Sequence, residues 1–378
     1  MPFTLLGLDL SLVKVIDSLD YKKPYPIQQK AIPAILEKND VLGIAKTGSG
    51  KTASYVLPIL QNLQSVVAEK NRNVNALIVV PTRELAVQIE EVFRQFSSHL
   101  PNRVKTMAVY GGVSINPQMK ALYGVDALIA TPGRLIELVD SKAIHLSSVS
   151  TLVLDEADKM LNLGFKDEMD KIFSLLPSVR QNLLFSATLS EGVDKINRVL
   201  LTNPVVIKIE EEEDNIDQIK QVAYSVSEEG KGPLLRHLLT KYKDHQVLVF
   251  TSSTRKADNV GHKLRKNGIP CEAIHSKKSQ GARTAALREF KAGRLKVLIA
   301  TDLLSRGIDI DSLPFVINYE LPRSPKDYIH RIGRTGRAEA MGEAISFITP
   351  EDTSHFKTIQ KKMGKWVTMI NSDSLSLS

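Results

Sequence analysis

The chain of 378 residues is poor in several features, and each scarcity excludes a class of protein. Cys271 is the only cysteine, so no disulfide can form within the chain, which fits a reducing compartment. No apolar run is long enough to span a bilayer, and the N-terminal segment lacks the basic start of a signal peptide. Six of the eight histidines show no spacing typical of metal ligands. We therefore expect a soluble, cytoplasmic protein without a membrane segment.

Charge is distributed unevenly along the chain. Residues 1–205 carry 22 basic and 20 acidic side chains, a net charge of +2, and residues 206–218 carry one basic and six acidic, a net charge of −5. Residues 219–362 carry 26 basic and 15 acidic side chains, a net charge of +11. A positive second half favours a polyanionic partner, although ordinary soluble domains can be as basic as this.

Short β-rich apolar runs alternate with helical patterns through both halves. They lie at 41–45, 76–80, 107–110, 127–130, 152–154 and 183–185, then at 247–251, 272–275, 297–300, 315–318 and 344–348. Such alternation predicts parallel sheets with helices on both faces, an α/β fold. We expect one domain at 1–205, an acidic linker at 206–218, a second domain at 219–362 and a short tail at 363–378.

A glycine-rich segment follows the first apolar run and precedes a helical pattern. It reads Ala45-Lys46-Thr47-Gly48-Ser49-Gly50-Lys51-Thr52. Glycines in this context let backbone N–H groups surround a phosphate, while the lysine reaches the β- and γ-phosphates and the threonine hydroxyl binds Mg²⁺. The segment therefore predicts a site for a nucleoside triphosphate.

An acidic tetrad, Asp155-Glu156-Ala157-Asp158, directly follows the apolar run at 152–154. Carboxylates at the carboxyl end of a buried parallel strand face the crevice where ligands bind. We expect Asp155 to hold Mg²⁺ and Glu156 to orient and deprotonate the attacking water. The alternative for the tetrad alone is a solvated acidic turn.

A basic segment, His330-Arg331-Ile332-Gly333-Arg334-Thr335-Gly336-Arg337, begins on a helix that Ser324 is expected to cap. Arg334 and Arg337 could stabilise the charge that develops on a departing γ-phosphoryl group, as arginine fingers do. A solvated turn and phosphate contacts to nucleic acid are alternatives of similar weight for this segment alone.

Together, these three segments resemble motifs of the DEAD-box RNA helicases, a branch of superfamily 2 with tandem RecA-like domains. The resemblance covers about residues 3–350 and some ten motifs in the family's order. It implies that Tyr21 stacks on adenine and Gln28 reads its edge. It further implies RNA contacts at Arg83, Gly112, Thr131 and Arg134, and coupling of ATP state to strand separation through Asp158, Ser186 and Thr188.

The resemblance continues through the second half. It implies RNA contacts at Gln280, Arg283 and Thr301, a ribose contact at Asp309, coupling roles for Asp302 and His330, and finger roles for Arg334 and Arg337. The chain departs from the usual pattern at Tyr25, where threonine or serine is common, and at Asp20 and Ser276, where glycine is common.

The resemblance and the motifs predict a monomeric, magnesium-dependent ATPase. It should bind RNA by contacts to the RNA backbone, largely without sequence preference, and melt short duplexes locally. A non-enzymatic RNA clamp and a DNA translocase of the same plan are the competing hypotheses. For Trp366, beside Lys362 and Lys365, we expect packing of a last helix rather than an RNA contact, and we expect a frayed end from Asn371.

Overall fold

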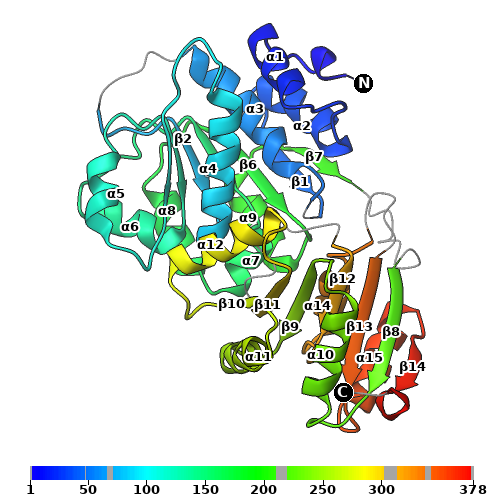
Figure 1. Cartoon of the computed structure of the whole chain (residues 1–378). Helices are drawn as coiled ribbons and strands as arrows, with labels where there is room; N and C mark the ends of the chain where they lie inside the picture. The colour runs from blue at the N-terminus through cyan, green and yellow to red at the C-terminus, as the bar shows by residue number, and fades with distance from the viewer. Residues whose placement is uncertain are drawn as a thin grey trace. The chain divides into compact units, whose positions relative to one another are not determined.

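The computed structural model describes residues 2–46, 48–65, 71–209, 219–301, 313–336 and 342–375. The chain divides into two compact units, Met1–Glu211 and Glu212–Ser378. Each unit contains one sheet of seven parallel strands with helices on both faces (Figure 1). This is the architecture of tandem RecA-like domains, as the sequence predicted.

The sheet of the first unit has the strand order β3-β4-β2-β5-β6-β1-β7. Its strands are β1 (Val41–Ile44), β2 (Ala76–Val79), β3 (Thr106–Val109), β4 (Ala127–Ala130), β5 (Thr151–Leu154), β6 (Gln181–Ser186) and β7 (Val205–Lys208). Successive residues of the inner strands alternate between two apolar clusters, one on each face, because side chains in a strand point to opposite sides.

Two sets of helices cover these faces. The first set contributes to one apolar cluster and comprises α1 (Leu10–Ser18), α2 (Pro26–Leu36), α3 (Lys51–Gln64) and α4 (Arg83–Ser97), preceded by the short 3-10 helix η1 (Phe3–Leu5). The second set packs on the opposite face and comprises α5 (Ile115–Ala121), α6 (Pro132–Asp140), α7 (Ala157–Asn162), α8 (Lys166–Ser174) and α9 (Glu191–Leu200).

The second unit has the strand order β10-β11-β9-β12-β13-β8-β14. Its strands are β8 (Ile219–Ser225), β9 (Val247–Thr251), β10 (Cys271–Ile274), β11 (Val297–Thr301), β12 (Phe315–Asn318), β13 (Gly342–Ile348) and β14 (Thr368–Asn371). Helices α10 (Lys231–Lys241) and α11 (Thr254–Lys266) pack on one face. The other face carries α12 (Gln280–Lys291), α14 (Pro325–Ile332) and α15 (Thr353–Met363), and the 3-10 helix η3 (Ser372–Ser374) follows β14.

The two units share one topology. Numbering the strands of the second unit from β8 as the first gives the order 3-4-2-5-6-1-7, which is also the order in the first unit. A residue that follows a given strand in one unit therefore has a counterpart that follows the matching strand in the other.

All eleven expected strands are present, most with ends shifted by one or two residues. The three strands that the sequence did not predict are β7, β8 and β14. Strands β7 and β14 lie at sheet edges and are largely exposed, so they need no continuous apolar run. Strand β8 contains Lys220 and Gln221, which interrupt its apolar pattern.

The helix cap expected at Ser324 is confirmed, and Thr82 caps α4 in the same way. The Thr82 hydroxyl accepts a hydrogen bond from Leu85 N at 3.3 Å, and the Ser324 hydroxyl accepts one from Asp327 N at 3.1 Å. Thr131 precedes Pro132 at the first position of α6, but its side chain makes no capping bond.

Three expectations were wrong: the extent of the linker, the frayed tail and the packing of Trp366. Residues 206–208, expected in the linker, belong to β7, whose partner is β1. The expected tail contains β14, which pairs with β8, and the Asn371 side chain accepts a hydrogen bond from Asp373 N at 3.0 Å, so residues 371–375 are ordered. Trp366 does not pack on the unit, because 71% of its surface is exposed. Residues 210–218 of the linker lie outside the described residues.

Candidate nucleotide and RNA site

The phosphate loop connects β1 to α3. Gly48 and Gly50 have φ values of +83° and +88°, in the left-handed region that favours glycine, and α3 begins immediately afterwards at Lys51. The loop thus presents backbone N–H groups at a helix N-terminus, which is the geometry that binds phosphate. Ser49 stabilises the turn, since its hydroxyl donates to Lys46 O at 2.8 Å. Thr47 lies outside the described residues.

Lys51 is buried beneath this loop, with 7% of its surface exposed. Its Nζ donates to Ala45 O at 2.5 Å. Burial lowers the pKa of the Lys51 ammonium, and the negative charges of Asp155 and Glu156 oppose that shift. The lysine therefore lies between the loop and the acidic tetrad.

Gln28 connects the start of α2 to the phosphate loop. Its Nε2 donates to Gly50 O at 3.0 Å, and its Oε1 accepts from Tyr25 N at 2.9 Å. A Cβ atom on Gly50 would approach Gln28 Nε2 to 2.6 Å, so glycine is required here for contact as well as for backbone angle. The amide of Gln28 is engaged within the chain, and the Tyr21 ring packs against Phe96 with a centroid distance of 5.3 Å.

Asp155 follows β5 and is held on both oxygens. Glu156 N donates to its Oδ1 at 2.8 Å, and the buried Tyr55 hydroxyl of α3 donates to its Oδ2 at 2.9 Å. Burial raises the pKa of Asp155, while Lys51 and the Tyr55 hydrogen bond oppose the shift. Sequence analysis missed Tyr55, which orients the carboxylate expected to hold the metal.

Glu156 adopts a strained backbone conformation, with φ at +56°. Its Oε1 forms a 2.6 Å ion pair with Lys159 Nζ, and its buried Oε2 has no hydrogen-bond partner. Burial raises the pKa of the Glu156 carboxyl, Lys159 lowers it and Asp155 raises it. A buried carboxylate with one uncommitted oxygen and a raised pKa suits a group that accepts a proton from water.

Asp158 connects the acidic tetrad to the end of β6. The Thr188 hydroxyl donates to Asp158 Oδ2 at 3.0 Å, and the Ser186 hydroxyl donates to Thr188 O at 2.9 Å. The three residues expected to couple ATP state to strand separation therefore form one hydrogen-bonded chain.

Of the residues of the first unit expected to contact RNA, Arg83, Thr131 and Arg134 lie at two helix starts, and Gly112 lies in the loop between β3 and α5. The guanidinium of Arg83, at the first position of α4, packs over Gly112, whose φ is +75°. Arg134 is 5% exposed and donates to Val113 O at 2.8 Å and to Glu137 Oε2 at 2.9 Å. Arg134 therefore connects the 111–114 segment to α6. Thr131 directly precedes the first residue of this helix.

In the second unit, Gln280 and Arg283 share the first turn of α12. Arg283 Nη2 donates to Gln280 Oε1 at 2.5 Å, and the helix is capped by Ser279, whose hydroxyl accepts from Ala282 N at 3.3 Å. Thr301 ends β11 and is 8% exposed.

The basic segment at the end of α14 is anchored by Arg331, which sequence analysis did not assign a role. Arg331 is 2% exposed, its Nη1 donates to Asn318 Oδ1 at 3.1 Å and to Glu320 O at 2.7 Å, and its guanidinium lies 4.9 Å from the centre of the Phe250 ring. Arg334 is buried next to it, whereas His330 is exposed. Asp302, Asp309 and Arg337 lie outside the described residues.

The first unit has oxygen donors that suit Mg²⁺. The described residues contain no group of three or more metal-binding side chains, so an all-protein cage is absent from them. Mg²⁺ is commonly held by one or two carboxylates together with substrate phosphates. The oriented carboxylate of Asp155 and the hydroxyl of Thr52, on α3 three residues before Tyr55, fit that type of site.

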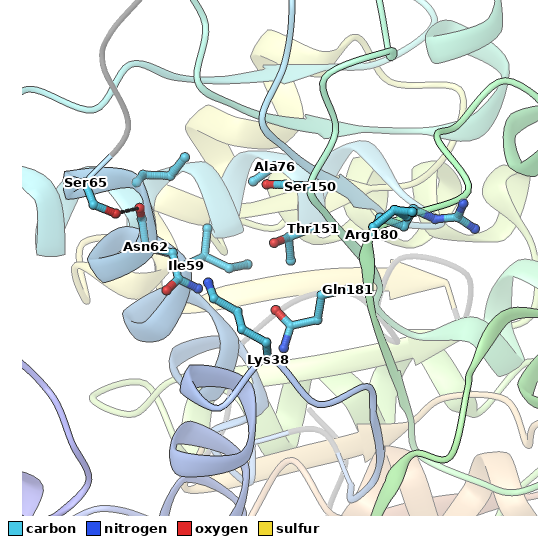
Figure 2. A pocket seen from close by; sticks show the side chains of 11 residues that line it. Lys38, Ile59, Asn62, Ser65, Ala76, Ser150, Thr151, Arg180 and Gln181 are labelled. Atoms are coloured by element: carbon cyan, nitrogen blue, oxygen red, sulfur yellow. Dashed lines mark hydrogen bonds between the residues drawn. The ribbon is translucent and has the colours of Figure 1, made fainter.

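A hollow of about 470 Å³ lies at the amino ends of β2, β5 and β6, the opposite end of these strands from Asp155 and the phosphate loop (Figure 2). Figure 2 shows Lys38 extending into it between Asn62 and Gln181. Helices α2 and α3 both end beside the hollow, and a lysine there compensates the partial negative charge of their C-termini. None of the expected site residues lines it.

Comparison with known proteins gives the class of the protein. Residues 25–196 match the DEAD/DEAH box helicase family, and residues 230–339 match the helicase conserved C-terminal domain. The chain is 38% identical to the ATP-dependent RNA helicase CshA of Listeria monocytogenes over 364 residues, 96% of this chain and 69% of that protein. It is 37% identical to the DEAD-box ATP-dependent RNA helicase CshA of Bacillus subtilis, over 94% of this chain and 71% of the relative.

Solved structures agree with this result. S. cerevisiae Dbp5 bound to RNA and ADP BeF3 is 30% identical, with a TM-score of 0.84 over 99% of this chain and 96% of that one. A DEAD box protein of the hyperthermophile Methanococcus jannaschii is 35% identical, with a TM-score of 0.54 over 98% and 99%. The protein is a helicase with two RecA-like domains. It belongs to the DEAD-box family of ATP-dependent RNA helicases. Among the described residues, no helix is both long and apolar enough to traverse a membrane.

Proposed function

We propose that this protein hydrolyses ATP in an RNA-stimulated reaction that requires Mg²⁺ and uses it to melt short RNA duplexes locally. The observation that carries the proposal is the joining of Lys51, Asp155 and Glu156 at one edge of the first sheet, with Asp158 linked to Thr188 beside them. One site thus combines phosphate binding, metal binding, water activation and a connection to the next strand.

In the proposed reaction, Lys51 exchanges Ala45 O for the β- and γ-phosphates, and the loop N–H groups bind the remaining phosphate oxygens. Asp155 and Thr52 would hold Mg²⁺, which would neutralise charge on those phosphates. Glu156 orients the attacking water through Oε2 and takes up its proton. Tyr21 stacks on adenine, Gln28 reads its edge, and Asp309 binds the ribose.

The second unit contributes the remaining charges in this proposal. Arg334 and Arg337 stabilise the departing γ-phosphoryl group when ATP closes the two domains on one another. RNA backbone phosphates bind at the starts of α4, α6 and α12, where Arg83, Thr131, Arg134, Gln280 and Arg283 lie, with Gly112 and Thr301 nearby. Closure bends the bound RNA strand. The coupling between ATP state and strand separation runs through the hydrogen-bonded chain Ser186-Thr188-Asp158 and through Asp302 and His330. The protein acts as a cytoplasmic monomer.

Glutamine at position 156 tests the water-activating role. Glu156→Gln keeps the size and one acceptor of the side chain but cannot take up a proton, so ATP turnover in saturating RNA should fall at least about a hundredfold. Affinities for ATP and RNA, measured by equilibrium titration, should stay within a few-fold. The matched control is Glu320→Gln. Glu320 is the second residue after β12 in the second unit, as Glu156 is the second residue after the matching strand β5 in the first.

Near-normal turnover in Glu156→Gln would remove the role of Glu156. A wild-type rate that is indifferent to RNA would contradict the whole proposal, and equal stimulation by DNA would favour the translocase. A stable RNA complex in ATP without duplex melting would favour the non-enzymatic clamp.

A further inference from the structure

The turn between α15 and β14 presents the chain's only tryptophan to solvent. Trp366 is 71% exposed, although tryptophan is a residue that folded proteins usually bury in large part. Met369, three residues further, is 46% exposed. Two large apolar side chains therefore remain uncovered at one end of the second unit.

This exposure is a consequence of a well-anchored turn. Val367, the next residue, is buried in the apolar cluster beneath α14 and α15, and its N–H donates to Gln360 Oε1 at 2.8 Å. Gly364 ends α15 in the left-handed conformation, and β14 begins at Thr368 with pairing to Val222. Both sides of Trp366 are fixed, so the indole is held outward by the fold.

The surroundings of Trp366 are exclusively basic in sequence. Residues 353–372 contain four lysines and no acidic residue. Lys357, Lys361 and Lys362 are exposed on α15 and form no ion pair within the described part of the chain. An exposed aromatic ring that directly follows a helix with exposed lysines suits single-stranded nucleic acid, because bases stack on the ring while phosphates attract the cations.

Trp366 lies far from the residues of the same unit that are expected to contact RNA. Gln280 and Arg283 are on α12, which follows β10 at one edge of the sheet, whereas Trp366 precedes β14 at the opposite edge. Six strand spacings separate the two edges, about 29 Å of sheet. A strand bound at α12 would need additional nucleotides to reach the indole.

We propose that Trp366, with Lys357, Lys361 and Lys362, forms a second binding site for single-stranded RNA that holds the strand outside the segment being melted. The site takes one unpaired base on the indole and neighbouring phosphates on the lysines. The proposal uses RNA binding from the proposed function but none of its catalytic steps.

The lone tryptophan makes the proposal directly testable, because tryptophan fluorescence of the native protein, excited where tyrosine does not absorb, reports on position 366 alone. A stacked strand of about six nucleotides spans roughly 20 Å, less than the sheet width, whereas one of about twenty spans roughly 68 Å. Titration with the longer RNA should quench the fluorescence, and the six-nucleotide RNA should quench it far less. Inorganic polyphosphate, which has charge but no bases, should leave it nearly unchanged.

Affinity measurements provide the second readout. Trp366→Ala should weaken binding of the longer RNA at least about fivefold, and Trp366→Phe should retain most of it because phenylalanine also stacks. Both variants should match the wild type on the six-nucleotide RNA. Lys361→Glu with Lys362→Glu should weaken binding of the longer RNA and flatten its salt dependence.

Absence of quenching by the longer RNA, or unchanged affinity of Trp366→Ala for it, would overturn the proposal, and the surface would then fit a protein partner better. The maximal ATPase rate in saturating RNA should be the same for wild type and Trp366→Ala. Quenching by RNA in a protein whose ATPase ignores RNA would support this site and contradict the proposed function, so the two outcomes can be distinguished.

Discussion

The two units have the same strand order, yet only the first carries a phosphate loop after its first strand. There Gly48, Ser49 and Gly50 precede Lys51 at the start of α3. In the second unit, Glu228, Glu229 and Gly230 precede Lys231, the first residue of α10. The two lysines hold matching positions, and they are 7% and 3% exposed.

The difference lies in how the lysine charge is used. Lys231 forms ion pairs with Glu228 at 2.9 Å and Asp352 at 3.9 Å, and lies 5.9 Å from the centre of the Tyr319 ring. Carboxylates thus occupy the place that phosphates take in a phosphate loop, and their charge repels an anion. Lys51 Nζ instead donates to a neutral carbonyl, Ala45 O, and can exchange that bond for one to a phosphate without breaking an ion pair within the described residues.

The fifth strands show the same contrast. Asp155 follows β5 and is oriented by Tyr55, four residues after Lys51. In the second unit Tyr319 follows β12, and Leu235 lies four residues after Lys231. The same position therefore occurs in both units, and we expect a few side chains to determine which of the two binds a nucleotide.

The largest effect should separate the two lysines. Lys51→Ala removes the cation that we propose contacts the phosphates, and ATP turnover should fall at least about a hundredfold. Lys231→Ala removes a cation already neutralised by carboxylates, and turnover at a temperature where both variants are folded should stay within about twofold. Steady-state ATPase assays with saturating RNA measure both, and equal losses would break the comparison.

Arg331 should matter for stability in the second unit. Arg331→Lys keeps the charge but loses the planar contact with Phe250 and part of the hydrogen bonding to Asn318 and Glu320, so unfolding should require about 2–3 kcal/mol less. Arg288→Lys, at a site 74% exposed, should change the free energy of unfolding by less than about 0.5 kcal/mol. Urea unfolding followed by Trp366 fluorescence reports on this unit, and similar losses in the two variants would contradict the anchoring role.

Tyr55→Phe should change metal dependence in the first unit. Without its hydroxyl, Asp155 is less firmly oriented, so the Mg²⁺ concentration for half-maximal ATPase should rise roughly three- to tenfold, with turnover at saturating Mg²⁺ reduced less. Tyr328→Phe removes another buried hydroxyl, one that contacts Ser346 at 3.1 Å in the second unit. If both variants shifted the Mg²⁺ dependence equally, the effect would be one of general stability.

The smallest effect concerns backbone strain. The non-glycine residues with left-handed φ in the described chain are Asp20, Lys38, Lys142, Glu156 and Asn203, all in the first unit. Asp20→Gly should relieve strain at φ +60° and raise the free energy of unfolding by about 0.5–1 kcal/mol. Asp17→Gly, inside α1, should lower it by roughly 0.3 kcal/mol, because glycine is a weaker helix former than aspartate. Denaturation followed by circular dichroism distinguishes the two signs.

Sequence was sufficient for features that depend on neighbouring residues. Buried runs such as 127–130 and 247–251 became the expected strands, and the loop before Lys51 took the expected place between strand and helix. Glycine is common at position 20 in the family, and the left-handed φ of Asp20 gives the physical reason.

Features that depend on distant residues could not be predicted. Tyr55 and Asp155 are a hundred positions apart, and the tyrosine lies within an ordinary apolar helix pattern. The exposure of Trp366 follows from the burial of Val367 beside it, which requires knowing that residues 368–371 form a strand next to β8. Arg134 fits the family pattern for an RNA contact, but only the structure reveals its bond to Val113 O.

The hydrogen bond from Lys51 to Ala45 O has a thermodynamic consequence. This ammonium has already shed most of its hydration shell, and that loss belongs to the free energy of folding rather than to ligand association. A phosphate bound as proposed would displace one peptide oxygen instead of several water molecules, so the ordering of the lysine would be complete before the ligand arrives.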